Sequence, residues 1–145
     1  MKLYIMCGLP DSGKTTKAAA LAEETGATVI SHDAYYKTVI RPSDVVTREM
    51  LEQVTENALA DVKAHLENGE DVIYDAVNTK AKNRRAVLEK CMAEGLHTVC
   101  VYIATPLEVC ESRGGMWSRV FAQSFEPPTP DEGFDELLIL AGEQE

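Results

Sequence analysis

A glycine-rich motif of eight residues near the amino terminus constrains the fold more than any other feature of this chain. Residues 8–15 read Gly-Leu-Pro-Asp-Ser-Gly-Lys-Thr and match the pattern GxxxxGK[ST] at every fixed position. Such a loop needs a buried strand before it and a helix after it, because its backbone N–H groups and the first turn of the helix must converge on phosphate oxygens. The chain meets both needs: residues 3–7 are an apolar run, and residues 14–25 show helical spacing that ends at Gly26.

Short apolar runs alternate with helical patterns along the rest of the chain. Further strands are predicted at residues 27–30, 71–74 and 97–103, and further helices at residues 43–68, 80–93 and 116–124. Another helix is predicted from Thr105-Pro106-Leu107-Glu108, which combines a capping box with proline in the first turn. This alternation predicts an α/β protein of the P-loop NTPase fold, with a parallel sheet of four to five strands and helices on both faces. Ligands bind such sheets beyond the carboxyl ends of the strands.

The glycine-rich loop predicts a binding site for ATP, or another nucleoside triphosphate, together with Mg²⁺. Its backbone N–H groups surround the phosphates, Lys14 bridges the β and γ phosphates, and Thr15 offers its hydroxyl to the metal. The predicted nucleotide-binding residues are Gly8, Asp11, Ser12, Gly13, Lys14, Thr15 and Thr16, of which Thr15 is the predicted metal ligand.

Two carboxylates follow the second and third predicted strands and therefore belong at the same edge of the sheet. Asp33 ends the run Ser31-His32-Asp33, where it could accept a proton from an acceptor hydroxyl, hold Mg²⁺ through water, or cap the following turn. Asp75 ends the third strand, where it could position the acceptor or cap the next helix. Both are predicted site residues.

The net charge of −10 is unevenly distributed. Seven of the 24 acids and none of the 14 basic residues lie in residues 126–145, so residues 1–125 have a net charge of only −3. Because phosphate binding depends on lysine and arginine, the acidic net charge of the chain argues against a nucleic-acid partner. The first 125 residues could nevertheless bind an anion.

The four cysteines, at positions 7, 91, 100 and 110, lack the spacing of a zinc site, and we expect them to be small core residues in a reducing compartment. Trp117 and Phe121, four residues apart in a predicted helix, are expected in the core as well. No apolar stretch approaches the roughly 20 residues of a membrane helix. The amino terminus opens into a strand-like run instead of a secretory signal. These features predict a cytoplasmic protein without a membrane partner, of undetermined oligomeric state.

Several segments, in this order, resemble one family of enzymes. The loop, the His-Asp pair with tyrosines behind it, and the segments DVIYDAVNTKAKNRR, VCVYIATPLEVCESR and FEPPTPDEGFDEL are similar to the small P-loop kinases typified by the kinase domain of bacteriophage polynucleotide 5′-hydroxyl kinase. The resemblance covers nearly the whole chain. It implies a kinase core over residues 1–125 with a short lid near residues 105–124, and an acidic, proline-containing segment 126–145 that packs on this domain or trails from it.

The same resemblance implies a role for each site residue. Lys14 and Thr15 would contact ATP and Mg²⁺, Asp33 would be the general base, and Asp75 would lie near the acceptor. An arginine of the lid would stabilise the charge on the migrating phosphoryl group. Arg113 is the predicted lid cation and Arg119 the second candidate, although either could belong to a solvated helix face.

The chain departs from the polynucleotide kinases at two places. An arginine that follows the base by three residues in that family is replaced here by Tyr36. The lid is also short, because Gly114-Gly115 follows Arg113 directly and Arg119 is the only basic residue after it.

Residues near the predicted site edge are candidate contacts for the acceptor. Arg84 lies in the basic run of residues 80–85 after the third strand, and could receive an anionic acceptor or lie on a solvated helix face. The pair Tyr35-Tyr36 could stack on a base, although packing of one ring under the loop is equally expected. We predict Asp75, Tyr36 and Arg84 as acceptor-binding residues.

The sequence therefore favours an ATP-dependent phosphotransferase that acts on a polynucleotide 5′-hydroxyl or another nucleic-acid hydroxyl. A small-molecule kinase for a nucleoside or a sugar is the first alternative, favoured by the acidic tail, Tyr36 and the short lid. A nucleotide-binding protein with little turnover, acting through partners, is the second, and only the short lid favours it.

Overall fold

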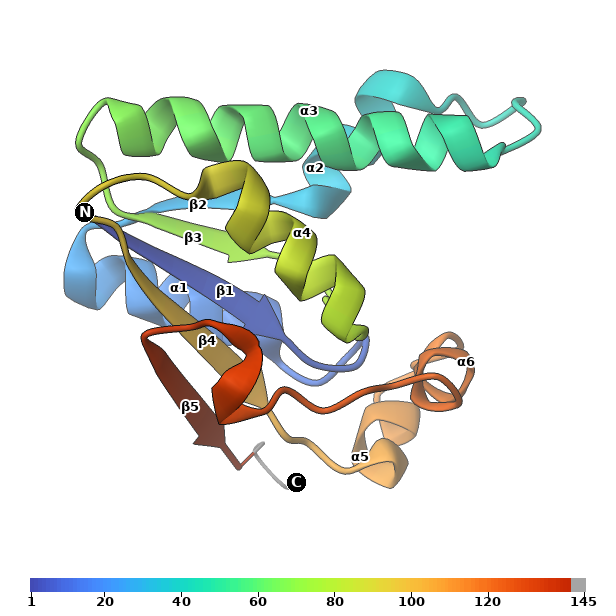
Figure 1. Ribbon diagram of the computed structural model, residues 1–145. Coiled ribbons are helices and arrows are strands. Elements are labelled where there is room, and N and C mark those ends of the chain that lie inside the picture. The colour runs from blue at the N-terminus through green and yellow to red at the C-terminus, as the bar shows by residue number, and fades with distance from the viewer. Residues whose placement is uncertain (142–145) are drawn as a thin grey trace.

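Five parallel strands form the centre of the protein, in the order β2-β3-β1-β4-β5 (Figure 1). The computed structural model describes residues 1–141. The strands are β1 (Lys2–Cys7), β2 (Thr28–Ser31), β3 (Val72–Asp75), β4 (His97–Ile103) and β5 (Glu136–Leu140). Each neighbouring pair is parallel. The predicted α/β fold with a parallel sheet is confirmed.

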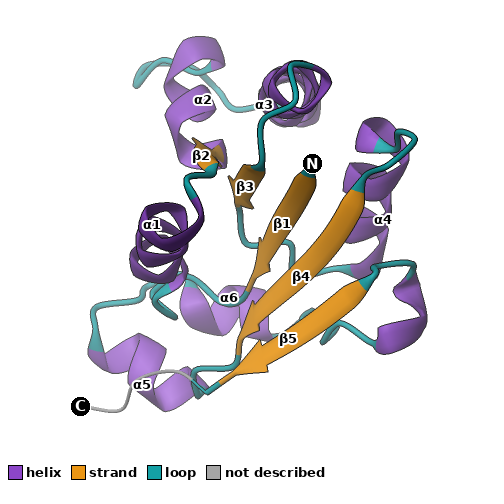
Figure 2. Ribbon diagram, turned by 90° about the vertical axis from the view of Figure 1, so that its left-hand side faces the viewer, coloured by secondary structure: helices purple, strands orange, loops and turns teal. Residues whose placement is uncertain are grey.

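Helices cover both faces of this sheet. They are α1 (Lys14–Thr25), α2 (His32–Val39), α3 (Arg48–Glu67), α4 (Ala81–Cys91), α5 (Leu107–Ser112) and α6 (Ser118–Ala122), followed by the 3₁₀ turn η1 (Pro130–Glu132). Figure 2 shows α1 on one side of the sheet and α4 on the other. Because the connections between parallel strands must cross the sheet, the helices lie against its faces and shield the strands from water.

The two faces of β1 show how the strands are buried. Leu3 and Ile5 pack with residues of α3 and α4, whereas Tyr4 and Met6 pack with Ala18 of α1. Successive side chains of a strand point to opposite faces, so a strand buried on both faces is apolar throughout. This explains the continuous apolar run that preceded the glycine-rich loop in the sequence.

Helix α3 begins later than predicted. Arg41-Pro42-Ser43-Asp44 forms a turn instead, in which Asp44 Oδ2 accepts a hydrogen bond from Arg41 N at 2.8 Å. Thr47 then caps the helix by accepting from Met50 N at 3.2 Å. The side chains of Asp44 and Thr47 thus keep residues 43–47 out of the predicted helix. Short polar side chains can do so because they compete with the backbone hydrogen bonds of a helix.

The predicted capping box at Thr105 is wrong. Helix α5 has Pro106 at its N-cap position and no side-chain cap. The Thr105 hydroxyl instead donates to Ser12 O at 2.6 Å, so the connection after β4 is bonded to the glycine-rich loop.

The acidic carboxyl-terminal segment contributes a strand to the sheet. After η1, Phe134 is only 9% exposed and joins the core on the α3 and α4 face. Strand β5 then pairs with β4, with Val99 opposite Glu136 and Ile103 opposite Leu140. Phe134 and β5 therefore pack against the core and the sheet, and residues 142–145 of the predicted segment lie outside the described residues.

The cysteines lie where the sequence predicted them. All four are buried and none is disulfide-bonded: Cys7, Cys91, Cys100 and Cys110. Within residues 1–141, no helix combines the length and the apolar character that a membrane crossing requires.

Candidate active site

The glycine-rich loop joins β1 to α1 at the carboxyl edge of the sheet. Gly8 packs so tightly that a Cβ atom there would lie 2.9 Å from Ile103 O and 2.9 Å from Ser12 Oγ. Its own N–H donates to Val77 O at 3.1 Å. Gly8 thus holds the loop between the ends of β3 and β4, and a larger residue would push the loop out of position.

Lys14 lies inside the loop and is only 8% exposed. Its Nζ donates to Leu9 O at 2.9 Å. Burial lowers the pKa of Lys14, and the negative charges of Asp75 and Asp33 oppose this effect. The ammonium group is therefore held near the carboxylates at the ends of two other strands.

Ser12 has a buried hydroxyl that lacks a hydrogen-bond partner within residues 1–141. Buried polar groups in folded proteins are nearly always bonded, so an orphan suggests a missing partner. A phosphate oxygen bound in the loop is a chemically suitable acceptor for it. The other predicted loop residues lie nearer the surface: Asp11 and Thr16 are exposed, and Asp11 adopts a left-handed backbone with φ of 61°.

Thr15 and Asp75 meet across two elements. The Thr15 hydroxyl donates to Asp75 Oδ2 at 2.9 Å, and Asp75 is only 6% exposed at the end of β3. Asp75 does not cap α4, whose N-cap residue is Lys80. A hydroxyl beside a carboxylate is an oxygen donor set that suits Mg²⁺, and P-loop proteins hold the metal with such a pair. The residues present therefore fit Mg²⁺, and the predicted contact of Asp75 with the acceptor stays a prediction.

Asp33 lies in the first turn of α2, directly after β2. It is exposed, and its charge acts on both Lys14 and His32. His32 fixes this turn, because its Nε2 lies 3.1 Å from Thr55 Oγ1 of α3. The structure thus gives Asp33 an anchored backbone and a carboxylate open to solvent.

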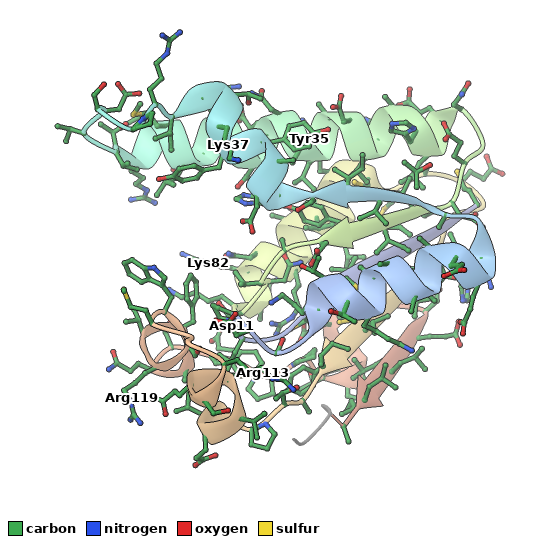
Figure 3. All side chains as sticks on the ribbon, turned by 180° about the vertical axis from the view of Figure 1, so that it is seen from behind. Asp11, Tyr35, Lys37, Lys82, Arg113 and Arg119 are labelled. Atoms are coloured by element: carbon green, nitrogen blue, oxygen red, sulfur yellow. The ribbon has the colours of Figure 1, made fainter. Side chains whose placement is uncertain are left out.

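Helix α5 lies in the predicted lid, residues 105–124, and Arg113, directly after this helix, lies against the loop. Arg113 Nη1 donates to Asp11 O at 3.1 Å, and a Cβ on Gly13 would lie 3.8 Å from the same nitrogen. Figure 3 shows Arg113 next to Asp11, with Arg119 farther out on the lid. Arg119 instead binds Glu111 through two bonds of 2.9 Å and is held at the outer surface. Of the two predicted lid cations, Arg113 is the one beside the loop.

Gly115 allows the lid to pack closely on the loop. A Cβ at this position would lie 2.0 Å from Ser118 Oγ and 2.8 Å from Asp11 Oδ2. The Ser118 hydroxyl, fully buried, lies 3.2 Å from Pro10 O. Gly115 therefore lets this segment pack directly on the loop, whereas a Cβ at Gly114 would meet nothing within 4 Å.

Arg84 lies in a buried ion pair with Glu132, which does not fit the predicted contact with an acceptor. Its side chain is fully buried, with Nε and Nη2 bonded to the Glu132 carboxylate at 2.8 and 3.0 Å. Nη1 donates to Asn78 O at 2.8 Å. The sequence feature that indicates burial of Arg84 is its position on the apolar stripe of its helix, between Ala81 and Val87.

The two tyrosines behind Asp33 have different environments. Tyr35 donates its hydroxyl to Asp61 of α3, and burial together with this carboxylate raises the pKa of Tyr35 to about 12. Tyr36 is 39% exposed. Of the pair, Tyr36 is the one whose ring is open to solvent, but it carries no charge for a phosphate.

The prediction that Trp117 lies in the core is wrong. Trp117 is 60% exposed, and its neighbours Met116 and Val120 are 80% and 51% exposed. Helix α6 has only five residues, which cannot bury a full apolar stripe. Phe121, the other residue of the predicted stripe, is partly buried and does not join the buried core either.

A phosphate-binding loop between the first strand and the first helix, with a hydroxyl–carboxylate pair at the same sheet edge, defines a P-loop nucleotide-binding domain. The model of an AAA-domain family, AAA_33, matches residues 3–115, and the chain belongs to this family. No curated protein matches the chain.

Solved structures share the fold. An unliganded sugar kinase from Janibacter sp. HTCC2649 is 21% identical, with a TM-score of 0.71, and the match covers 97% of this chain and 84% of that one. Kti12 from Chaetomium thermophilum, in complex with ADP-AlF3, is 20% identical with a TM-score of 0.71 and coverages of 96% and 88%. A chain of the Pnkp1/Rnl/Hen1 complex is 23% identical with a TM-score of 0.69 and coverages of 92% and 43%. At these identities the likeness shows the fold alone.

Proposed function

We propose that this protein is an ATP-dependent, Mg²⁺-requiring phosphotransferase that moves the γ-phosphoryl group onto a hydroxyl acceptor. The observation that carries the proposal is the meeting of three groups at one sheet edge. Lys14 comes from the loop, the Thr15–Asp75 pair joins α1 to β3, and Asp33 follows β2. A cation, a metal position and an exposed carboxylate are the parts that phosphoryl transfer to a hydroxyl requires.

The nucleotide is held by the loop and the groups around it. Loop N–H groups and the Lys14 ammonium bind the phosphate oxygens, and Ser12 offers its unpaired hydroxyl. Thr15 and Asp75 hold Mg²⁺, which supplies neutralising charge to the phosphates when bound.

Asp33 acts as the general base. Its carboxylate is open to solvent on a turn that His32 anchors, so an acceptor hydroxyl can approach it. The base accepts the hydroxyl proton while the oxygen attacks the γ-phosphorus, and ADP leaves with its negative charge facing Lys14.

Arg113 supplies positive charge from the lid side. Its guanidinium already lies at Asp11 O, next to the phosphate-binding loop. Because charge spreads over the phosphoryl oxygens during transfer, a cation placed there acts mainly in the transition state.

The acceptor that we favour is the 5′-hydroxyl end of a polynucleotide, or another hydroxyl of a nucleic acid. The motif resemblance and the fold shared with a chain of the Pnkp1/Rnl/Hen1 complex support it. The uncharged Tyr36, the net charge of −10 and the fold shared with a sugar kinase favour the alternative, a small-molecule kinase for a nucleoside or a sugar.

One experiment separates these possibilities. Labelled phosphate transfer from [γ-³²P]ATP is measured in parallel with a 5′-hydroxyl oligonucleotide, free nucleosides and free sugars including gluconate. Transfer to the oligonucleotide supports the favoured acceptor, and transfer to a nucleoside or sugar alone supports the alternative. Tight ATP binding without transfer to any of them overturns the phosphotransferase proposal and leaves a nucleotide-binding protein.

A further inference from the structure

A hollow of about 690 Å³ lies between the first turn of α4 and the segment that follows α6. Its lining residues are Lys80, Ala81, Lys82, Arg85, Gln123, Ser124, Phe125 and Glu126. We call it the α4 groove. Its volume lies within the range of roughly 300–1,000 Å³ that small-ligand sites occupy, and exceeds what a lone phosphate would fill.

Positive charge is concentrated in the α4 groove. Three of the chain's 14 basic residues, Lys80, Lys82 and Arg85, line it, and none of them forms an ion pair with another part of residues 1–141. The one carboxylate in the lining, Glu126, accepts a hydrogen bond from Ala81 N at 2.9 Å and so is already engaged. The groove is thus a cationic site on an acidic protein.

A neighbouring hollow shows that this charge is local. That hollow, of about 310 Å³, lies farther along α4, shares Arg85 with the α4 groove, and is lined by the carboxylates Glu89, Glu132 and Asp135. Both hollows border the same helix, yet only the α4 groove has an excess of positive charge in its lining.

The far wall of the α4 groove is fixed to the helix. Glu126 N donates to Thr79 O at 2.8 Å, in addition to the bond from its carboxylate to Ala81. The ring of Phe125 packs edge-on against Tyr102, with centroids 5.4 Å apart and planes at 70°. A preformed wall with a partly exposed aromatic ring lowers the cost of ordering a bound ligand.

The α4 groove opens at the same sheet edge as the candidate active site. Helix α4 begins six residues after Asp75, which ends β3, so Lys80 and Lys82 at its start belong to the carboxyl edge of the sheet. In the view of Figure 3, the Lys82 label lies between those of the α2 residues and that of Asp11. The cations of the α4 groove therefore share a sheet edge with Asp33 and the loop.

We propose that the α4 groove binds a phosphate group of the acceptor, close to the hydroxyl that receives the phosphoryl group. The proposal rests on the proposed function and narrows its substrate class to acceptors that already carry a phosphate. Arg85 can bind a phosphate with two parallel N–H bonds, whereas Lys80 and Lys82 act as point charges. Tyr36 itself offers no charge for this purpose, and the cation nearest to it in sequence is the exposed Lys37 of α2.

The test compares the double variant Lys82→Ala/Arg85→Ala with Lys90→Ala, which removes an exposed cation from the last turn of the same helix. The probe is a 3′-fluorescein-labelled, 5′-hydroxyl decathymidylate, whose binding is followed by anisotropy without ATP. We expect the double variant to bind it on the order of tenfold more weakly at low salt, and to lower the slope of log K against log salt by about one to two. Lys90→Ala should bind like the parent protein.

Further arms identify the source of the phosphate. A nucleoside 3′-monophosphate and a sugar phosphate are used as single-phosphate acceptors, and a free nucleoside as the uncharged control. In the double variant KM should rise for the phosphorylated acceptors that the parent protein uses, with kcat and the KM for ATP unchanged. A rise for the oligonucleotide alone indicates a nucleic-acid strand, and a rise for single phosphates indicates a smaller ligand.

Three results overturn the proposal: unchanged probe binding in the double variant, equal weakening by Lys90→Ala, or a matching loss of ATP affinity, which would assign the α4 groove to the nucleotide. Its failure is distinguishable from failure of the proposed function, because binding is measured without transfer. Normal transfer by the parent protein with unchanged probe binding in the double variant overturns the groove proposal alone. Weaker probe binding in the double variant, when the parent protein transfers phosphate to no acceptor, overturns the proposed phosphotransferase alone.

Discussion

At the scale of single residues, the two carboxylates of the site differ in exposure and therefore in the chemistry open to them. Asp75 is only 6% exposed and accepts a bond from Thr15, which suits a fixed position beside a metal. Asp33 is exposed on the first turn of α2, which suits a group that must meet a second substrate and take its proton. This difference in burial supports the proposed division of Asp75 as a metal ligand and Asp33 as the general base.

Replacing Asp33 by Asn tests the base directly, because the amide keeps the size of the side chain but cannot accept the proton. We expect kcat to fall by roughly 10² to 10⁴, the range for positioned acid–base groups, with little change in ATP affinity. Steady-state transfer and equilibrium ATP binding are the measurements, with Glu56→Gln, exposed on α3, as control. A loss of Mg²⁺-nucleotide binding with an unchanged rate per bound nucleotide would instead make Asp33 a metal ligand.

Replacing Arg113 by Ala should lower kcat by about 10³ or more while raising the KM for ATP much less, because a lid cation acts mainly as charge develops. Arg119→Ala is the matched control, since its guanidinium is occupied by Glu111. If only the Arg119 variant shows a loss of kcat, the lid cation has been assigned to the wrong arginine.

The place of the glycine-rich loop between a strand and a helix could be predicted because each fixed position of the motif has one physical role. Arg84 could not be placed by charge alone, since a basic run on a helix usually faces water. Its position on the apolar stripe was the better guide, and it required a partner, Glu132, that lies 48 residues away. The prediction that Trp117 lies in the core failed because helical spacing does not reveal whether a sheet lies close enough to cover the side chain.

At the scale of elements, three connections converge on the glycine-rich loop. The β3–α4 connection accepts from Gly8 N through Val77 O, the β4–α5 connection donates from Thr105 to Ser12 O, and the lid lies against Pro10 O through Ser118. The loop is therefore held from three sides before any nucleotide binds, which reduces the ordering that binding requires.

The Arg84–Glu132 pair joins α4 to the carboxyl-terminal segment, so its loss should loosen β5. Glu132→Gln leaves a buried guanidinium without its charge partner, and we expect a loss of about 3 kcal/mol in the free energy of unfolding. Urea unfolding gives the loss, and hydrogen exchange shows whether β5 opens first. Asp131→Asn, one residue away and exposed, should have little effect. Equal exchange of β5 in both variants would contradict the anchoring role.

The same pair predicts a pH dependence. Burial raises the pKa of Glu132, but hydrogen bonds from Arg84 and from Thr129 outweigh it, and the net pKa lies below the ordinary 4.5. A lowered folded-state pKa gives stability that is present above 4.5 and is lost as the pH falls through the folded-state value. The stability gap between the parent protein and Glu132→Gln should therefore be constant near neutral pH and shrink in acid. A gap that does not change with pH would show that Glu132 is not charged in the folded protein.

Strand and helix types were predictable from periodicity, whereas their ends depended on polar side chains with several possible partners. Thr105 has the neighbours of a capping box but donates to Ser12 O instead, and Thr47 caps α3, which begins five residues later than predicted. The predicted count of four to five strands allowed for β5, but its position was not predicted, because its surroundings are acidic and rich in proline. Its signal was the uncharged apolar run from Leu137 to Leu140.

At the scale of the whole molecule, the strand order places the chemistry. The neighbouring strands β2, β3 and β1 lead into α2 with Asp33, end in Asp75 and lead into the loop, respectively, so residues far apart in sequence lie at adjacent strand ends (Figure 1). Periodicity gives the strands but not their order, which is why the sequence could predict a shared edge but could not show that Thr15 bonds Asp75. The order also leaves β5 at the edge beyond β4.

The proposed nucleotide site takes its groups from the loop after β1, from β3 and from α1. A bound Mg²⁺-nucleotide should therefore stabilise the whole fold. A ligand that binds only the folded state adds about 2.7 kcal/mol at a hundredfold excess over Kd, which for a domain of this size corresponds to a rise in Tm of roughly 5–15 °C. Thermal unfolding with ATP, in Mg²⁺ or in EDTA, separates the metal-dependent part. Thr15→Val, which removes the hydroxyl bonded to Asp75 and preserves shape, should lose that part and keep the rest. The same rise in EDTA as in Mg²⁺, or a Thr15 variant that responds to Mg²⁺ like the parent protein, would show that Thr15 and Asp75 do not hold the metal.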